Sequence, residues 1–277
     1  MACVVRMDVS PLDERIEFGR KAVEQQVEYF TRQFGSVASD WKTDGSRVTE
    51  ADLYLSKTFQ KELLAAFSED QFFSEELDHG DESIEVMPGY AWLLDPIDGT
   101  NNFARGIPTC SISLGLLKDG FPVYGYVYDY ASGKLLHGGM GKGVFIGGSP
   151  IEKKRSKVDS NSLISMQCWR NKQAIEQENA LQMLYKLRAF GSSAIHTAYA
   201  AVGWTDGVIA HRIKSWDIVA GVAMMKGAGG STRFFDTKVF PMKTFSTQEV
   251  GFGHISGSEE MCDAIEKAIG RTCAYRV

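Results

Sequence analysis

The first residues with a clear pattern show the spacing of an amphipathic helix. Apolar positions in 11–34 recur at intervals of three, four or seven residues, the period of a helix with one buried face. That face consists of Ile16, Val23, Val27, Phe30 and Phe34. Gly35 follows as a candidate C-terminal cap. The pattern therefore predicts a helix over residues 11–34.

A second helix is predicted to begin near Thr49. The run TEAD places Asp52 three residues after Thr49, the spacing of a capping box in which each residue binds the other's backbone N–H. The apolar positions that follow predict its buried face, which consists of Leu53, Phe59, Leu63 and Phe67.

From residue 72 onward the period becomes that of strands. The runs FFSEE (72–76) and YAWLLD (90–95) predict strands that end in acids. Residues 111–129 predict two strands joined by an Asp-Gly turn. Short strands with frequent glycines follow in 134–148. The first half is therefore expected to contain antiparallel strands.

Helices and strands alternate in the second half. Strands are predicted at 162–166, 207–210 and 249–256, and helices at 174–188, 194–202, 216–227 and 259–269. Together the two patterns predict an α+β fold of layered helices and sheets. The pattern changes near 150–161, so we expect an N-terminal half (1–150) and a C-terminal half (151–277).

Composition narrows the classes of function. A chain of 277 residues that is 44% hydrophobic can bury a large core. The net charge of −5, without a basic cluster, argues against a nucleic-acid partner. The five scattered cysteines form no CxxC pair, which favours reduced thiols over disulfides or a zinc site. We see no signal peptide and no apolar run of membrane-spanning length, so we expect a cytoplasmic protein without a membrane partner.

Candidate chemistry is concentrated in WLLDPIDGTNNF, residues 92–103. A strand that ends in Asp95 carries that carboxylate to the sheet edge, and Pro96 is expected to stop the strand. The turn returns Asp98 beside Asp95, where two repelling carboxylates need a proton or a cation between them. The Ile97 carbonyl can join them as a ligand of a hard divalent cation. Gly99 allows close backbone approach and opens a predicted helix start suited to phosphate.

Each of these acids also has a purely structural interpretation. The run DPIDG is rich in turn residues, and Asp217 in SWDIVAG can be a helix cap. Further acids lie at Asp52 and at Glu75 and Glu76. If they converge, the arrangement is the one needed for metal-assisted attack of water on a phosphate ester.

The motifs jointly resemble the inositol monophosphatase family of magnesium-dependent, lithium-sensitive phosphatases. The family signature W-x-x-D-P-[IL]-D-G-T-x-N-F stands here complete, and W-D-x-A-A-G followed by A-G-G is matched by WDIVAGVAMMKGAGG (216–230). VTEAD (48–52) and SEE (74–76) match the upstream motifs. The resemblance covers nearly the whole chain. It implies an α/β/α/β/α sandwich of the inositol monophosphatase/fructose-1,6-bisphosphatase type and a homodimer.

The resemblance also implies roles for individual residues, with two or three Mg²⁺ ions per site. The implied metal ligands are Glu75, Asp95, the Ile97 carbonyl, Asp98 and Asp217. The attacking water would lie between Glu75 and Thr100, with Asp52 bonded to Thr100 as the third catalytic residue. The implied substrate-binding residues are Gly99, Thr100, Gly191, Ser192, Ser193, Ala210 and Asp217.

Specificity is where the chain departs from the family pattern. Inositol-specific members carry a glutamate seven residues before the second-motif aspartate, and this chain has Ala210 there. His211, Arg212 and Lys214 follow, either as contacts for a substrate or as a solvated basic turn. We therefore expect a Mg²⁺-dependent hydrolase of a small sugar or polyol phosphate such as inositol monophosphate. The alternatives are a phosphatase of histidinol phosphate, fructose 1,6-bisphosphate or a nucleotide 3'-phosphate, or a catalytically weak binding protein. The run DGSRVTEAD (44–52) resembles the histidinol-phosphate branch.

Overall fold

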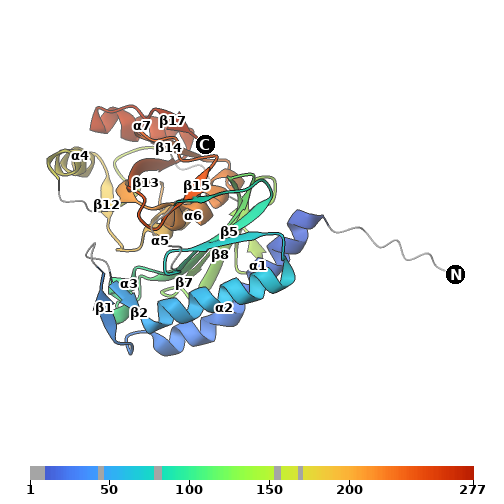
Figure 1. Cartoon of the computed structure of the whole chain (residues 1–277). Helices are drawn as coiled ribbons and strands as arrows, with labels where there is room; N and C mark the ends of the chain where they lie inside the picture. The colour runs from blue at the N-terminus through green and yellow to red at the C-terminus, as the bar shows by residue number, and fades with distance from the viewer. Residues whose placement is uncertain (1–9, 43–46, 78–82, 153–156, 168–170) are drawn as a thin grey trace.

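The computed structural model describes residues 10–42, 47–77, 83–152, 157–167 and 171–277. Its helices and sheets alternate in layers as an α/β/α/β/α sandwich (Figure 1), which confirms the expected α+β class. The helices are α1 (Pro11–Gln33), α2 (Glu50–Ala66), α3 (Thr100–Ala104), α4 (Lys172–Gln182), α5 (Ser193–Val202), α6 (Ser215–Gly227) and α7 (Glu259–Ile269).

The first sheet has seven strands in the order β10-β9-β8-β7-β6-β5-β3. Every neighbouring pair is antiparallel except β3 and β5. Its strands are β3 (Gln71–Ser74), β5 (Tyr90–Asp98), β6 (Ser111–Lys118), β7 (Phe121–Asp129), β8 (Lys134–Gly139), β9 (Gly143–Ile146) and β10 (Ser149–Pro150). The predicted Asp-Gly turn joins β6 to β7 at residues 119–120.

The second sheet has six strands in the order β12-β11-β13-β16-β14-β17. Only β11 pairs in parallel, with β12 and with β13, and the other pairs are antiparallel. These strands are β11 (Leu163–Met166), β12 (Lys186–Arg188), β13 (Gly207–Ile213), β14 (Ser231–Phe234), β16 (Phe252–Gly257) and β17 (Tyr275–Arg276). Two small sheets pair β1 (Ser39–Trp41) with β2 (Arg47–Thr49), and β4 (Ile84–Glu85) with β15 (Thr244–Phe245).

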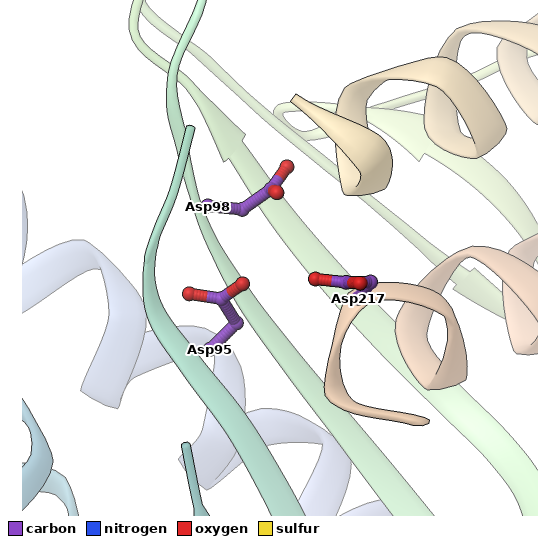
Figure 2. Close-up of side chains that lie close together, drawn as sticks. All are labelled: Asp95, Asp98 and Asp217. Atoms are coloured by element: carbon purple, nitrogen blue, oxygen red, sulfur yellow. The ribbon is translucent and has the colours of Figure 1, made fainter. Parts of the chain in front are cut away.

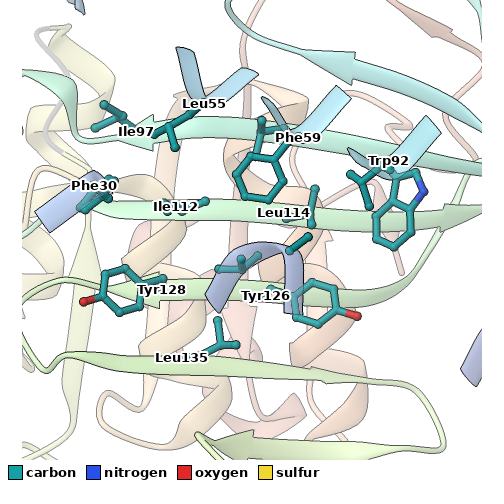
Figure 3. Close-up of a cluster of buried hydrophobic side chains, with 14 of the residues drawn as sticks. Phe30, Leu55, Phe59, Trp92, Ile97, Ile112, Leu114, Tyr126, Tyr128 and Leu135 are labelled. Atoms are coloured by element: carbon teal, nitrogen blue, oxygen red, sulfur yellow. The ribbon is translucent and has the colours of Figure 1, made fainter. Parts of the chain in front are cut away.

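Helices α1 and α2 cover the outer face of the first sheet. The capping box predicted at Thr49 and Asp52 is present at the start of α2. The apolar faces of both helices enter one buried cluster with the sheet (Figure 3). Phe30, Phe59 and Leu63 lie in this core as predicted, but Leu53 is 40% exposed. It precedes the buried Leu55 by two positions, which turns its side chain away from the sheet.

Helix α6 lies between the two sheets and is apolar on nearly every side. Its backbone approaches the first sheet where two strands carry glycine. A Cβ added at Gly125 would lie 2.2 Å from the Ala220 carbonyl oxygen, and one at Gly115 would lie 2.2 Å from Val219. Because a side chain cannot fit in that space, these glycines fix how closely α6 approaches the sheet.

Two predicted boundaries are wrong. Strand β5 does not stop at Pro96 but continues to Asp98, with a shift of register between Asp95 and Asp98. Proline is tolerated there because the chain bulges and because β3 ends opposite Leu94, leaving no ladder to break. The helix predicted over 174–188 ends at Gln182, and residues 186–188 form the edge strand β12.

The remaining predictions on composition are tested only in part. Cys110, Cys262 and Cys273 are buried free thiols, whereas Cys3 and Cys168 lie outside the described residues. Among the described helices, none has both the length and the apolarity needed to cross a bilayer. Residues 44–46 of the run DGSRVTEAD are also outside the described part. The division into halves at 150–161 stays a prediction.

Candidate active site

The end of β5 presents two buried aspartates. Asp95 and Asp98 are 2% and 5% exposed and lie on either side of the bulge. The Ile97 backbone N–H donates to Asp95 at 3.1 Å. Pro96 and Ile97 oppose the single residue Ile112 on β6, so the bulge adds one residue and both carboxylates reach the same end of the strand.

The third carboxylate comes from the other half of the chain. Asp217 is the third residue of α6 and accepts a hydrogen bond from the Lys214 N–H at 2.7 Å. Helix capping, the structural interpretation of Asp217, is therefore present. Asp217 also faces Asp95 and Asp98 (Figure 2), and one oxygen from each of the three carboxylates lies within 4.8 Å of the others. Asp95, Asp98 and Asp217 are called the carboxylate cluster below.

Burial and repulsion make this cluster costly without a cation. Burial raises the pKa of Asp95 well above its usual range, and the charges of Glu75, Asp98 and Asp217 raise it further. Burial likewise raises the pKa of Asp217, with Asp98 adding to the effect. A divalent cation would offset both the burial of these carboxylates and the repulsion between them. Carboxylate oxygens are also the ligands that hard cations prefer. The residues present therefore fit a metal site.

Asp98 also joins the cluster to the predicted substrate loop. It accepts hydrogen bonds from the Ala194 N–H at 2.8 Å, from the Ser193 N–H at 3.1 Å and from the Ser192 hydroxyl. Burial raises the pKa of Asp98, and these bonds partly offset the increase. The loop 191–193 thus lies beside the cluster, as expected, and Asp98 caps α5.

Gly99 and Thr100 form the turn that follows the cluster. Gly99 has φ +83°, a left-handed conformation that favours glycine. An added Cβ there would lie 3.1 Å from the Gly191 carbonyl oxygen, so the turn packs directly against the substrate loop. The Thr100 hydroxyl donates to the Ile97 carbonyl at 2.9 Å, the carbonyl predicted as a metal ligand.

Comparison with known proteins agrees with this geometry. The sequence model of the inositol monophosphatase family matches residues 8–264. The chain belongs to this family. Its members are phosphatases and depend on metal ions, so the protein is a hydrolase of phosphoric monoesters.

Individual relatives extend over most of the chain. A fructose-1,6-bisphosphatase/inositol-1-monophosphatase of Thermotoga maritima is 28% identical over 229 residues, 81% of this chain and 86% of that protein. An inositol-1-monophosphatase of Rhizobium meliloti is 26% identical over 260 residues, 91% of this chain and 94% of that protein. Among solved structures, the Thermotoga maritima IMPase has a TM-score of 0.77 at 26% identity, covering 93% of this chain and 97% of its own.

Glu75, which the family pattern makes a metal ligand, lies outside the carboxylate cluster. It follows β3, and Lys42 Nζ donates to it at 2.9 Å and also to Glu76. Burial lowers the pKa of Lys42, but Glu75 and Glu76 more than offset this and raise it overall. Sequence reasoning missed Lys42, because a lone lysine in a polar loop gives no signal.

The predicted hydrogen bond between Asp52 and Thr100 is absent. Asp52 accepts instead from the N–H and hydroxyl of Thr49, at 2.7 and 2.6 Å, and its other oxygen has no partner among the described residues. Burial raises the pKa of Asp52 to about 7. Asp52 is thus held by the capping box of α2, and Thr100 turns toward Ile97.

The side chains of His211 and Lys214 have partners away from the cluster. Ala210 is 2% exposed and belongs to the same apolar core cluster as Ile213 and Trp216. His211 stacks on Phe235, with ring centroids 6.1 Å apart. Lys214 Nζ donates to the Glu249 carbonyl. Ala210 is therefore not confirmed as a substrate contact, and His211 and Lys214 have structural partners of their own.

Proposed function

We propose that this protein is a Mg²⁺-dependent phosphatase of a small sugar or polyol monophosphate such as inositol monophosphate. The main support is the carboxylate cluster, in which one oxygen from each of the three acids lies within 4.8 Å of the others and the pKa of each acid is raised. Such a cluster is stable in its charged form only beside a cation. Relatives of this chain are named as phosphatases of inositol monophosphate, fructose 1,6-bisphosphate and NADP.

Asp95, Asp98 and Asp217 would hold the cations. Glu75 would become a further ligand by giving up its ion pair with Lys42. The Ile97 carbonyl would become a ligand when the Thr100 hydroxyl no longer donates to it. Bound there, Mg²⁺ would stabilise the charge on the phosphate and make an adjacent water a better nucleophile.

The protein's own groups would orient the reactants. Once free of Ile97, the Thr100 hydroxyl can bind the attacking water, and the Glu75 carboxylate can accept its proton. The N–H groups that follow Gly99 would contact the phosphate. The Ser192 and Ser193 side of the cluster would face the alcohol part of the ester, because Asp98 holds that loop in place.

A metal-dependence assay tests this function. Phenyl phosphate turnover should vanish in EDTA, return with Mg²⁺ and fall on addition of Li⁺. Asp95→Asn should abolish it at saturating Mg²⁺, whereas the control Glu260→Gln, on an exposed residue of α7, should retain it. Full activity of Asp95→Asn, or of the wild type in EDTA, would show that the assignment is wrong.

Two expectations concern the molecule rather than the site. We propose that the protein is a homodimer, as the family resemblance implies, and that it acts in the cytoplasm. Sedimentation velocity tests the first expectation, and cell fractionation tests the second.

A further inference from the structure

A cavity of about 500 Å³ opens beside the carboxylate cluster. Ser192 and Ser193 line it and also bind Asp98, so cavity and cluster share one wall. Asn102, two residues after Thr100, lines another side. A volume in the range of about 300–1,000 Å³ is typical of small-molecule sites. The alcohol part of a phosphate ester held at the cluster can extend into this space.

Gln167 places a side-chain amide in the wall of the cavity. Its backbone N–H donates to the Ile209 carbonyl at 3.1 Å, which holds it at the end of β11 beside β13. Its Nε2 donates to the Ser193 hydroxyl, and its Oε1 accepts from the Arg212 N–H, both at 3.4 Å. These bonds are longer than the usual 2.7–3.2 Å or so. A substrate hydroxyl could therefore replace either at low cost.

The rest of the described lining of the cavity is neutral and partly apolar. Ile107, Met166 and Phe190 supply apolar contacts, and none of the described lining residues is an acid, a lysine or an arginine. Burial lowers the pKa of the lining residue His196 to about 4, so its ring is uncharged at neutral pH. A second phosphate or an ammonium group that entered would lose water without gaining an opposite charge from these described lining residues.

We propose, building on the phosphatase function above, that Gln167 is a specificity-determining residue whose amide binds the alcohol part of the substrate. The cavity thereby selects monophosphates of neutral alcohols that combine hydroxyl groups with an apolar face. It discriminates against bisphosphates and against cationic alcohols such as histidinol.

The role of Gln167 is tested by comparing two esters. Phenyl phosphate has no hydroxyl on its alcohol part, whereas myo-inositol 1-phosphate has several. Gln167→Leu should lower the ratio of kcat/KM for the inositol ester to that for phenyl phosphate by about tenfold, because a hydrogen-bonding group is removed. The matched control Gln182→Leu, on an exposed residue at the end of α4, should leave the ratio unchanged. An unchanged ratio in Gln167→Leu would contradict the role.

The neutrality of the cavity is tested with fructose 1-phosphate and fructose 1,6-bisphosphate. The wild type should prefer the monophosphate. Ile107 is 43% exposed at the cavity, so Ile107→Arg can add a cation there without burying it. This variant should raise the relative kcat/KM for the bisphosphate by about tenfold or more, and the neutral control Ile107→Gln should not. A wild type that prefers the bisphosphate would overturn the inference.

The phenyl phosphate assay separates the two levels of failure. Absence of Mg²⁺-dependent turnover of this ester would contradict the phosphatase function itself. Turnover with ratios that none of these variants changes would contradict only the roles given to Gln167 and the cavity.

Discussion

Asp95 and Asp98 belong to one cluster but differ in their surroundings. Within the described part of the chain, Asp95 accepts one hydrogen bond, from the Ile97 N–H, whereas Asp98 accepts bonds from the start of α5. The charge on Asp95 is therefore mainly a cost in the metal-free protein. The charge on Asp98 is partly compensated by the donors that surround it.

This difference predicts stability changes of opposite sign. In EDTA, Asp95→Asn should raise Tm, because it removes a buried repelling charge. Asp98→Asn should lower Tm by the equivalent of about 1–3 kcal/mol, because its amide N–H₂ would face the N–H donors of α5. Thermal unfolding of both variants in EDTA measures this, with wild type in EDTA and in Mg²⁺ as references. A lower Tm for Asp95→Asn would contradict the origin given for its raised pKa.

At the scale of single residues, the sequence predicted which side chains belong to the site better than it predicted their hydrogen-bond partners. The carboxylate cluster was expected from two motifs, and all three of its acids meet. The partner of Glu75 was not predicted, since Lys42 reaches it through the fold rather than through a sequence spacing. For Asp52, the capping-box contact with Thr49 was predicted, but the expected bond to Thr100 is absent. Gln167 was missed as well, because a glutamine that follows a strand has no distinctive pattern.

Among the elements, period and capping identified most helices and strands, and tertiary context decided the exceptions. The capping box at Thr49 is local and was confirmed. Strand β5 passes through Pro96 because neither neighbouring strand needs the missing N–H. Residues 186–188 pair with β11 instead of extending α4, a long-range choice that helical periodicity cannot reveal.

The contact between α6 and β7 gives a prediction at this scale. Gly125→Ala should lower the free energy of unfolding by about 1–3 kcal/mol, because its Cβ would overlap the Ala220 backbone. It should also lower kcat at saturating Mg²⁺, since α6 carries Asp217. Gly148→Ala is the matched control, because an added Cβ there has no neighbour within 4 Å. Urea unfolding and steady-state kinetics test this prediction. A Gly125→Ala variant with the wild-type free energy of unfolding and the wild-type kcat would contradict it.

Across the whole molecule, the site depends on bringing two halves of the chain together. Asp95 and Asp98 lie on the first sheet, and Asp217 arrives on α6, which packs between the sheets. Neither periodicity nor composition predicts that meeting, so the sequence could place Asp217 only through the resemblance to a family. The layered fold is what turns separate acids into a metal site.

The same burial between layers makes the molecule sensitive to acid. His254, on β16, is 1% exposed and bonds through Nδ1 to the Ser256 hydroxyl at 3.0 Å. Burial, aided by His196 and His211, lowers its pKa to about 3, whereas an unfolded chain has a histidine pKa of about 6.5. Below pH 6.5 the unfolded state therefore binds the proton and the folded state does not. Stability contributed by neutral His254 is complete above pH 6.5 and is lost as pH falls toward 3.

This loss amounts to roughly 3 kcal/mol at pH 4 for His254 alone. His254→Gln should remove that contribution and flatten the dependence of unfolding free energy on pH between 6.5 and 4, whatever its effect at pH 7. Urea unfolding at several pH values, in EDTA throughout so that metal binding does not contribute, measures the slope for both proteins. His79→Gln provides a reference substitution elsewhere in the chain. Equal slopes for wild type and His254→Gln would mean that His254 is protonated in the folded protein, and that the interior around β16 admits the charge.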